Sequence, residues 1–288
     1  MDLKVTSFQD KKRRAINFAA MGVVYLLALL ASIPFVLVSS YILVKGAGSI
    51  DLAFFTQLPK GPGEQGGGMA NAIIGTGALV TMACMLGIPW GMATGIYLSE
   101  YGHGKTANIL RFTVDLLTSV PSIIVGIFVY GLIVSHTGYS SYAGSAALAI
   151  IMLPIVARST EEIMKLIPNS VREAGLALGL PRWKVILRIL VPGCLGGLVT
   201  GFMLAIARVA GETAPLLFTA FGNNFYSSSL SQPIASLPVQ IYNFSKSGFP
   251  DLVRQSWAGA LVLVGLVFFL NFGTRSLLYM KNRKESKV

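Results

Sequence analysis

Two side chains of opposite charge lie four positions apart inside one of the longest apolar segments of the sequence. Arg208 and Glu212 fall between Gly201 and Pro215, among alanine, glycine and aliphatic residues. Residues four apart share one helix face, and an ionisable side chain in an apolar span usually faces the protein interior or a water-filled cavity. A guanidinium presents a planar fork of donors that matches oxyanions. The expected chemistry is reversible oxyanion binding at Arg208, with Glu212 orienting the guanidinium; a structural salt bridge is the alternative.

A third ionisable residue stands near the end of another apolar segment. Arg158 follows Pro154 and precedes the run Ser-Thr-Glu-Glu. Arg158 is either a second contact for the anion that binds Arg208, on one path through the membrane, or an ordinary basic residue at the membrane surface. Arg111 and Asp115 are also four apart, and we interpret them as an ion pair without a binding role. The sequence has no metal-ligand spacing, so we expect no metal and no catalytic residue.

The polar segment 164–189 separates two apolar segments and predicts a short amphipathic helix over 170–180. Pro168 suits the first turn of a helix, and Ser170 can cap it. Gly179 permits a sharp exit at the other end. Such a helix can seat in a groove on a cytosolic partner. A helix that merely lies on anionic lipid is the alternative.

Long uncharged runs must position these residues. Hydrophobic residues make up 53% of the 288 residues and charged residues 12%, roughly half the charged share of a soluble domain. Several runs exceed the roughly 20 residues that cross a hydrocarbon core, which predicts an all-α, polytopic membrane protein. The six expected spans lie near 16–44, 70–98, 111–135, 143–163, 190–220 and 256–280. They form one transmembrane domain, 16–280, between an N-terminal segment, 1–15, and a tail, 281–288.

The distribution of basic residues predicts the orientation of the spans. With a cytoplasmic N-terminus, 18 of the 23 lysines and arginines fall on the cytoplasmic side, and the outer loops hold only Lys45, Lys60, Lys246 and Arg254. An excess of basic residues is typical of cytoplasmic loops. We therefore expect a multi-pass protein of the cell inner membrane with both termini in the cytoplasm. The net charge of +11 is not arranged as a nucleic-acid surface.

The loop between the fourth and fifth expected spans resembles a signature of ABC importer permeases. That family carries Glu-Ala-Ala, three residues, Gly, nine residues, Ile, one residue and Leu-Pro. The matching positions are Glu173, Ala174, Gly175, Gly179, Ile189, Val191 and Pro192, with Gly175 in place of the second alanine and Val191 in place of the leucine. The resemblance implies a type I ABC importer permease fold. It also implies an ATPase-coupling role for Ser170, Val171, Glu173, Ala174, Gly175 and Gly179.

Three further stretches are similar to the A-type permease subunit of phosphate importers. They are Arg-Val-Ala-Gly-Glu-Thr-Ala-Pro-Leu-Leu-Phe-Thr at 208–219, Asp-Leu-Leu-Thr-Ser-Val-Pro-Ser-Ile-Ile-Val-Gly at 115–126 and Arg-Ser-Thr-Glu-Glu at 158–162. The resemblance implies an arginine-lined path for inorganic phosphate, with Arg208, Glu212 and Arg158 as its residues. A permease of the same class for sulfate, molybdate or phosphonate is the alternative, because a fork of donors does not distinguish tetrahedral anions.

The sequence contains no Walker A motif, whose Gly-rich loop and Lys would cradle the phosphates of ATP. The resemblance implies that ATP and Mg bind a separate ATPase chain, so this chain is expected to be neither an enzyme nor the carrier of a cofactor. The implied partners are membrane lipid, a second homologous permease (PstC-like), two copies of a cytosolic ATPase (PstB-like), an external phosphate-binding protein (PstS-like) and a PhoU-like regulator. A membrane enzyme or an ion-driven transporter is the rival class, but the spans lack paired carboxylates and a proton-relay chain.

Overall fold

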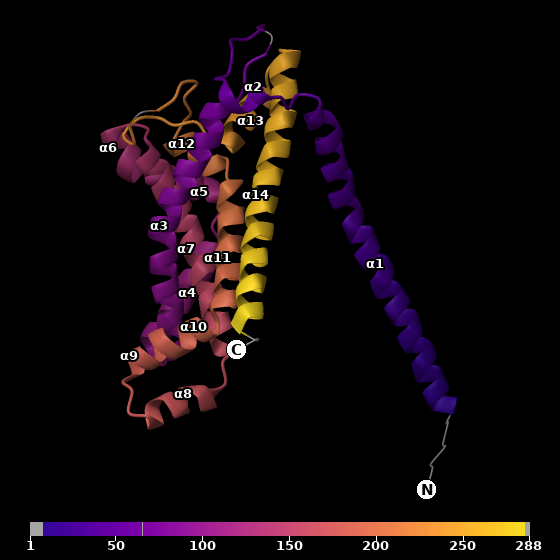
Figure 1. Ribbon diagram of the computed structural model, residues 1–288, viewed down its shortest axis with the longest axis vertical. Helices are drawn as coiled ribbons and strands as arrows, with labels where there is room; N and C mark the ends of the chain where they lie inside the picture. The colour runs from indigo at the N-terminus through magenta and orange to yellow at the C-terminus, as the bar shows by residue number, and fades with distance from the viewer. Residues whose placement is uncertain (1–7, 65, 228, 286–288) are drawn as a thin grey trace.

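The computed structural model describes residues 8–64, 66–227 and 229–285 of the chain (Figure 1). These residues are mostly helical and contain no strand, which confirms the expected all-α class. In chain order the elements are α1 (Phe8–Ala47), α2 (Leu52–Thr56), α3 (Ala70–Glu100), α4 (Lys105–Ser119), α5 (Ser122–Val129), the π-helical turn η1 (Tyr130–Val134), α6 (Ser135–Thr137), α7 (Ser141–Lys165), α8 (Asn169–Ala177), α9 (Arg182–Val185), the π-helical turn η2 (Ile186–Leu190), α10 (Val191–Gly193), α11 (Leu195–Ala210), α12 (Ala214–Thr219), α13 (Leu237–Ser245) and α14 (Pro250–Glu285).

Among the described residues, four helices are long and apolar enough to cross a membrane, and two bent helix pairs raise the number to six. The four long helices α1, α3, α7 and α14 each extend beyond the span expected at their position. The N-terminal segment 1–15 is described only from residue 8, where α1 begins, and the tail 281–288 continues α14 as far as residue 285. The other residues of these two segments lie outside the described part of the chain.

The third expected span, 111–135, is not the single helix that the sequence predicted. Its two halves, Lys105–Ser119 and Ser122–Thr137, meet at an angle of 101°. Val120 is extended, with φ −68° and ψ 127°, because the residue before a proline is disfavoured in the helical region. Pro121 then starts the second half, where its missing N–H leaves no intrahelical bond unmade.

The fifth expected span, 190–220, is also broken. Arg182–Gly193 and Leu195–Ala210 meet at an angle of 75°, within a sequence rich in glycine and next to Pro192. Such residues lower the cost of leaving helical geometry. The helix ends at Ala210 with Gly211 as its C-cap, and α12 begins separately after Thr213. The prediction of one continuous helix was therefore wrong here as well.

The bundle is built around the contact between α3 and α7 (Figure 1). Gly87, Gly91 and Gly95 form a stripe along α3, and a Cβ added at Gly91 would lie 2.7 Å from Cβ of Val156 on α7. Small residues let membrane helices approach closely without a hydrophobic driving force between them. The stripe fixes α7, which carries Arg158, against the rest of the bundle.

Helix α1 stands away from the bundle over most of its length (Figure 1). None of its most apolar window is buried in this chain, and its contacts occur near one end, where Gly46 lies under Leu261 and Tyr41 meets the Trp257 ring at 5.2 Å. A helix that is apolar on all sides requires lipid or another membrane-embedded chain around it.

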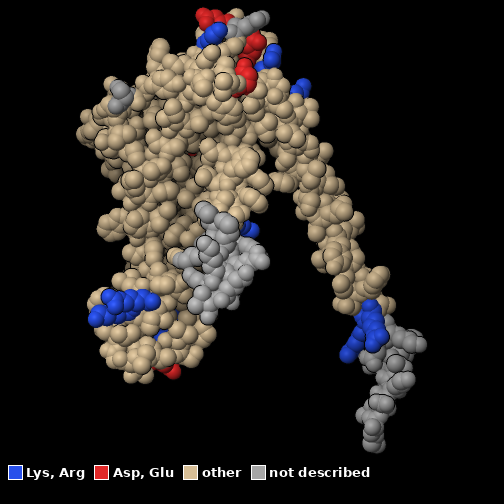
Figure 2. All heavy atoms as spheres, in the orientation of Figure 1, with Lys and Arg blue, Asp and Glu red and all other residues tan. Residues whose placement is uncertain are grey.

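Both ends of the described chain lie at the end of the bundle that carries α8 (Figure 1). At this end Figure 2 shows lysine and arginine side chains at the start of α1 and around α8 and α9. The opposite end carries α2, α13 and their loops, with acidic and basic side chains mixed. The α8 end is therefore the more basic of the two in this view.

Candidate functional site

Arg208 and Glu212 lie where α11 ends and the chain passes to α12, at the second interruption of the fifth expected span. Arg208 belongs to the last turn of α11, and Glu212 follows the Gly211 C-cap. Their side chains form an ion pair between Arg208 Nη1 and Glu212 Oε1. The Glu212 side chain is only 5% exposed, whereas 56% of the Arg208 side chain is accessible in this chain. The pair therefore has one buried member and one open member.

This difference in burial decides what the pair can bind. A buried carboxylate needs a cationic partner, and the end of α11 favours a cation through its unsatisfied carbonyl groups. Arg208 supplies that cation, yet a guanidinium carries five N–H donors and Glu212 occupies only part of them. The remaining donors are available to an oxyanion on the exposed side of the guanidinium.

Arg158 lies at a different depth in the bundle. Gly201 of α11 sits against Ser159 of α7, since an added Cβ would lie 2.6 Å from the Ser159 hydroxyl oxygen. Arg208 is seven residues further along α11, which corresponds to roughly 10 Å of helix rise. Two carboxylates already accompany Arg158, Glu162 at 2.9 Å and Asp115 at 3.5 Å. The structure therefore does not bring the two predicted arginines to one level.

The ion pair predicted between Arg111 and Asp115 is not formed. Arg111 Nε donates instead to Glu161 Oε1 at 2.8 Å, and Arg111 Nη2 donates to the backbone carbonyls of Leu98 and Gly102. The spacing rule considers one helix in isolation, whereas α7 offers the guanidinium a buried carboxylate across the bundle. Asp115 is left to pair with Arg158.

The loop helix expected over 170–180 is α8, Asn169–Ala177. Pro168 occupies the N-cap position, and no side chain caps the helix, so the capping role predicted for Ser170 is wrong. Ser170 lies inside the first turn because the extended conformation of Pro168 starts the helix one residue earlier. Gly179 has a φ of +75°, a conformation that favours glycine, and it turns the chain away from α8.

The two sides of α8 differ in exposure. Gly175 is buried, and a Cβ added there would lie 3.0 Å from both methyl groups of Val185. Val171 is 37% exposed and Leu178 is 79% exposed, and Glu173 and Ala174 are exposed beside them. An exposed apolar set with one carboxylate is suited to contact another protein.

An interaction that the sequence analysis missed attaches α8 to the bundle. Arg172 Nη2 and Nε donate to the carboxylate of Glu100, the last residue of α3, at 2.7 and 3.0 Å. The same guanidinium donates to the carbonyls of Ile167 and Met164 at 2.5 and 2.9 Å. The Glu100 carboxylate raises the pKa of Arg172, so the arginine stays charged. The sequence gives no local signal for this ion pair, because its two charges lie 72 positions apart.

Known proteins match this chain over most of its length. Residues 87–285 match the family described as binding-protein-dependent transport system inner membrane component. Of solved structures, a chain of the inward-facing MetNI methionine ABC transporter superposes with a TM-score of 0.60 at 19% identity, covering 74% of this chain and 96% of that one. The class is thus a multi-pass inner-membrane permease of an ABC importer with the type I fold, and not an enzyme.

Closer relatives specify the family within that class. The phosphate transport system permease protein PstA of Xylella fastidiosa strain Temecula1 is 44% identical over 93% of this chain and 94% of its own length. PstA of Yersinia pestis is 46% identical over 82% of this chain and 81% of its own, and PstA of Haemophilus influenzae is 40% identical over 94% and 96%. This chain belongs to the PstA family of permease proteins.

The attachment of α8 is testable through Glu100. We predict that Glu100→Gln removes the charge-assisted bonds to Arg172, which contribute about 1.5–3 kcal/mol, and loosens α8 from α3. Hydrogen–deuterium exchange of the amides in 169–177 should then be faster by roughly 10- to 150-fold. Glu173→Gln removes an equal charge from the exposed side of α8 and should leave the exchange unchanged. Equal exchange in both variants would show that the pair does not hold α8.

Proposed function

We propose that this chain translocates inorganic phosphate across the inner membrane as one permease subunit of an ATP-driven importer. The observation that carries the proposal is the open Arg208 guanidinium in the last turn of α11, held by a buried Glu212. The names of the PstA relatives support phosphate as the substrate and do not favour sulfate, molybdate or phosphonate. Arg158, already balanced by two carboxylates, serves as a secondary contact nearer the α8 end.

The mechanism that fits this arrangement is alternating access driven from outside the chain. ATP with Mg binds two copies of a cytosolic ATPase, and their closure moves α8 through its exposed apolar side and Glu173. Arg172 transmits the movement to α3 through Glu100, and the path to Arg208 opens to one side of the membrane at a time. No covalent chemistry occurs on this chain.

The exposed surfaces support the proposed partners. The uncovered sides of α1 suit a second, homologous permease together with lipid. The exposed residues of α8 and its C-cap, among them Val171, Glu173 and Leu178, suit the ATPase. The loops at the opposite end suit an external phosphate-binding protein. A PhoU-like regulator is proposed by family likeness alone.

The more basic α8 end of the molecule supports an orientation with that end in the cytoplasm. We predict that reporters fused after residues 14, 105, 180 and 285 are cytoplasmic, because basic loops remain on the cytoplasmic side. Reporters near residues 62, 140 and 235 should be external. Alkaline phosphatase and fluorescent-protein fusions measure the two locations, and a cytoplasmic signal at 235 would contradict the proposed topology.

The coupling role of α8 is tested by two substitutions. Gly179→Val forces a branched residue into a φ of +75°, where L-residues are strained, and Glu173→Lys reverses the exposed charge. We expect both variants to reach the membrane but to lose ATPase binding or transport-coupled ATP hydrolysis. Co-purification and hydrolysis assays in proteoliposomes measure these losses. Gly104→Val is the matched control, because Gly104 also has a positive φ but lies outside α8. Normal coupling in both α8 variants would refute the assignment.

Arg208 is tested by removing its charge. Arg208→Gln should reduce phosphate uptake by roughly 10- to 150-fold, because a hydrogen bond to a charged group contributes about 1.5–3 kcal/mol. Arg208→Lys should restore uptake only partly, since an ammonium lacks the planar fork. Labelled-phosphate uptake into vesicles measures both, with Arg254→Gln near the start of α14 as the control.

A double variant separates binding from charge neutralisation. If Arg208 only neutralises Glu212, then Arg208→Gln with Glu212→Gln should transport normally. If Arg208 binds the anion, the double variant should assemble and remain inactive. Restored uptake in the double variant would therefore overturn the site.

A further inference from the structure

The segment that joins the turn after α8 to α11 runs across the bundle instead of along it. Residues Arg182–Gly193, which comprise α9, η2 and α10, meet Leu195–Ala210 at an angle of 75°. Figure 1 shows this segment crossing the α8 end of the bundle. Because α11 is part of a membrane span, a segment at this angle has the orientation of a helix that lies along the membrane surface.

One side of this segment is buried against the rest of the chain. Val185, Ile186 and Leu190 are at most 4% exposed and form a core cluster with Met164 of α7. A Cβ added at Gly175 of α8 would lie 3.0 Å from both methyl groups of Val185. Packing thus fixes the segment to α7 and to α8, so its remaining sides keep a defined orientation.

The exposed sides of the segment divide into an apolar stripe and a basic stripe. Trp183 and Leu187 are 55% and 54% exposed, and side chains four positions apart share one side of a helix. Lys184 and Arg188 have the same spacing on the neighbouring side, and Arg182 precedes them. We call these five residues the α9–η2 face. A helix divided in this way suits the boundary between acyl chains and charged head groups.

The basic residues of the α9–η2 face have donors to spare. In the part of the chain that the structure describes, none of the three forms an ion pair. The Arg182 guanidinium lies 5.3 Å from the centre of the Tyr101 ring. Lys184 Nζ lies 5.4 Å from the centre of the Trp183 ring. A ring face attracts a cation electrostatically and leaves N–H groups available to an oxyanion.

Aromatic side chains place the α9–η2 face at the level of the lipid head groups. Tyr97 and Tyr101 stack at the α8 end of α3, with ring centres 6.4 Å apart, and Tyr101 is 39% exposed beside Arg182. Trp183 adds an exposed indole at the same end. Tryptophan and tyrosine are enriched where a membrane meets water. Figure 1 shows α8 farther from the bundle than α9, which leaves α8 to meet a protein and the α9–η2 face to meet lipid.

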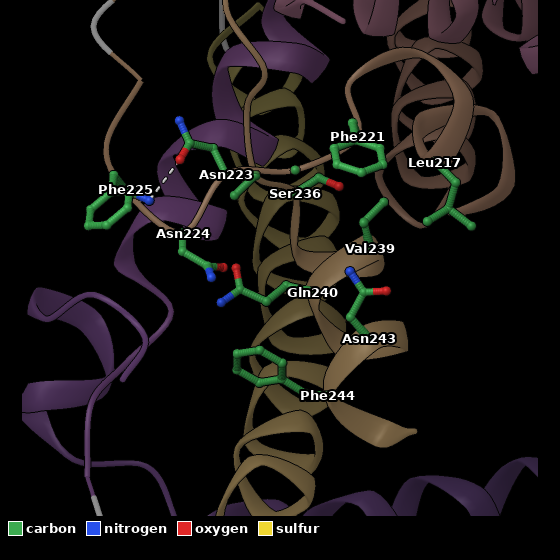
Figure 3. Close-up of a pocket in the computed structure, with 12 residues that line it drawn as sticks. Leu217, Phe221, Asn223, Asn224, Phe225, Ser236, Val239, Gln240, Asn243 and Phe244 are labelled. Atoms are coloured by element: carbon green, nitrogen blue, oxygen red, sulfur yellow. Dashed lines mark hydrogen bonds between the residues drawn. The ribbon is translucent and has the colours of Figure 1, made fainter. Parts of the chain in front are cut away.

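The opposite end of the bundle has a hollow of a different character. It has a volume of about 570 Å³ beside α13, and Figure 3 shows carboxamides and aromatic rings around it. Among the described residues that line this hollow, none is acidic or basic. Nothing in it selects an anion, whereas the α9–η2 face presents three cations beside an apolar stripe.

We propose that the α9–η2 face binds anionic phospholipid in the leaflet at the α8 end of the bundle. The lipid phosphates accept hydrogen bonds from the basic stripe, and the acyl chains contact the apolar stripe. In the orientation proposed above, this is the cytoplasmic leaflet. Bound lipid holds the segment in place, so α8 moves against a fixed support on the far side of the Gly179 turn. The proposal does not depend on which solute the permease carries.

Photoactivatable lipids test this face in the purified permease complex, reconstituted in nanodiscs of phosphatidylcholine and phosphatidylglycerol. Analogues of the two lipids with identical acyl chains are cross-linked, and mass spectrometry maps the labelled residues. Labelling of 182–190 should favour phosphatidylglycerol by at least about 5-fold, the attraction that one cation contributes near an anionic surface. The reference is Trp90 of α3, which is 69% exposed and lies roughly 15 Å of helix rise from Glu100. Labelling around Trp90 should not distinguish the two lipids.

Charge removal tests the cause of the preference. The triple variant Arg182→Gln, Lys184→Gln, Arg188→Gln should label equally with both lipids at 182–190. The matched control removes three exposed basic residues at the opposite end of the bundle and should keep the preference: Lys45→Gln, Lys246→Gln and Arg254→Gln.

A salt series on the unmodified complex keeps the test decisive if the triple variant fails to assemble. Raising the salt concentration from about 0.01 M to about 1 M shortens the Debye length from about 30 Å to about 3 Å, and the preference at 182–190 should disappear. Equal labelling of 182–190 by the two lipids at low salt would overturn the proposal. So would labelling of 182–190 by either lipid far below that around Trp90, because a protein would then cover the α9–η2 face.

Discussion

Hydrocarbon offers no partner for a backbone N–H or C=O group, and this constraint determines where the spans can break. A helix break inside a membrane is tolerated only where protein or a water-filled cavity surrounds it. The interruption between α11 and α12 satisfies this condition, because α5 packs against it: a Cβ added at Gly126 of α5 would lie 2.6 Å from Cα of Pro215 in α12. Val120 and Pro121, at the bend between α4 and α5, are exposed in this chain. The carbonyl groups left free at the end of α11 favour a cation, which is where Arg208 stands. The charge of Arg208 thus stands at the interruption between α11 and α12, where free carbonyl groups favour it.

Arginine–glutamate ion pairs occur at several levels of the helix bundle. The solvent exposure of each pair indicates whether it holds two helices together or can bind a solute. Arg172 is 19% exposed and Glu100 is 8% exposed, so that pair has little access to a solute. Arg208 is 56% exposed above a buried carboxylate, which leaves donors open. A closed pair of this kind fixes two elements, whereas an open pair can exchange one partner for a ligand. The chemistry is the same in both places, and burial decides whether it positions a helix or binds an anion.

The sequence predicted those features whose cause lies within one helix or one turn. Apolar run length predicted the helical class, the spacing of Arg208 and Glu212 placed them within reach of each other, and Gly179 was a local signal for its positive φ. The failures have a common origin in tertiary contacts. Arg111 bonds to Glu161 of another helix rather than to Asp115, because the packing of α4 on α7 is not written in either segment alone.

Other features had a local signal that was underused, or had none. Pro121 and Gly211 were visible in the sequence, but a long apolar run outweighed them when continuous spans were predicted. Ser236 and Gln240 gave no signal, since a serine and a glutamine near a helix start usually bind the backbone or water. Only the fold shows that Ser236 Oγ and Gln240 Nε2 are buried and have no hydrogen-bond partner among the described residues.

The broken spans also connect the two ends of the molecule through packed contacts. Arg111 of α4 donates to Glu161 and to the carbonyls of Leu98 and Gly102, on either side of Glu100. Glu100 in turn holds α8 through Arg172. Helix α4 continues through the bend at Pro121 into α5, and α5 packs on α12. In α12, Leu216 belongs to the buried core with Leu79 and Leu148, and Leu217 packs against that core. Packed interfaces of this kind shift between discrete arrangements rather than deform continuously. A displacement of α8 therefore has a contiguous route through α4 and α5 to α12, which follows Arg208 and Glu212 in the chain.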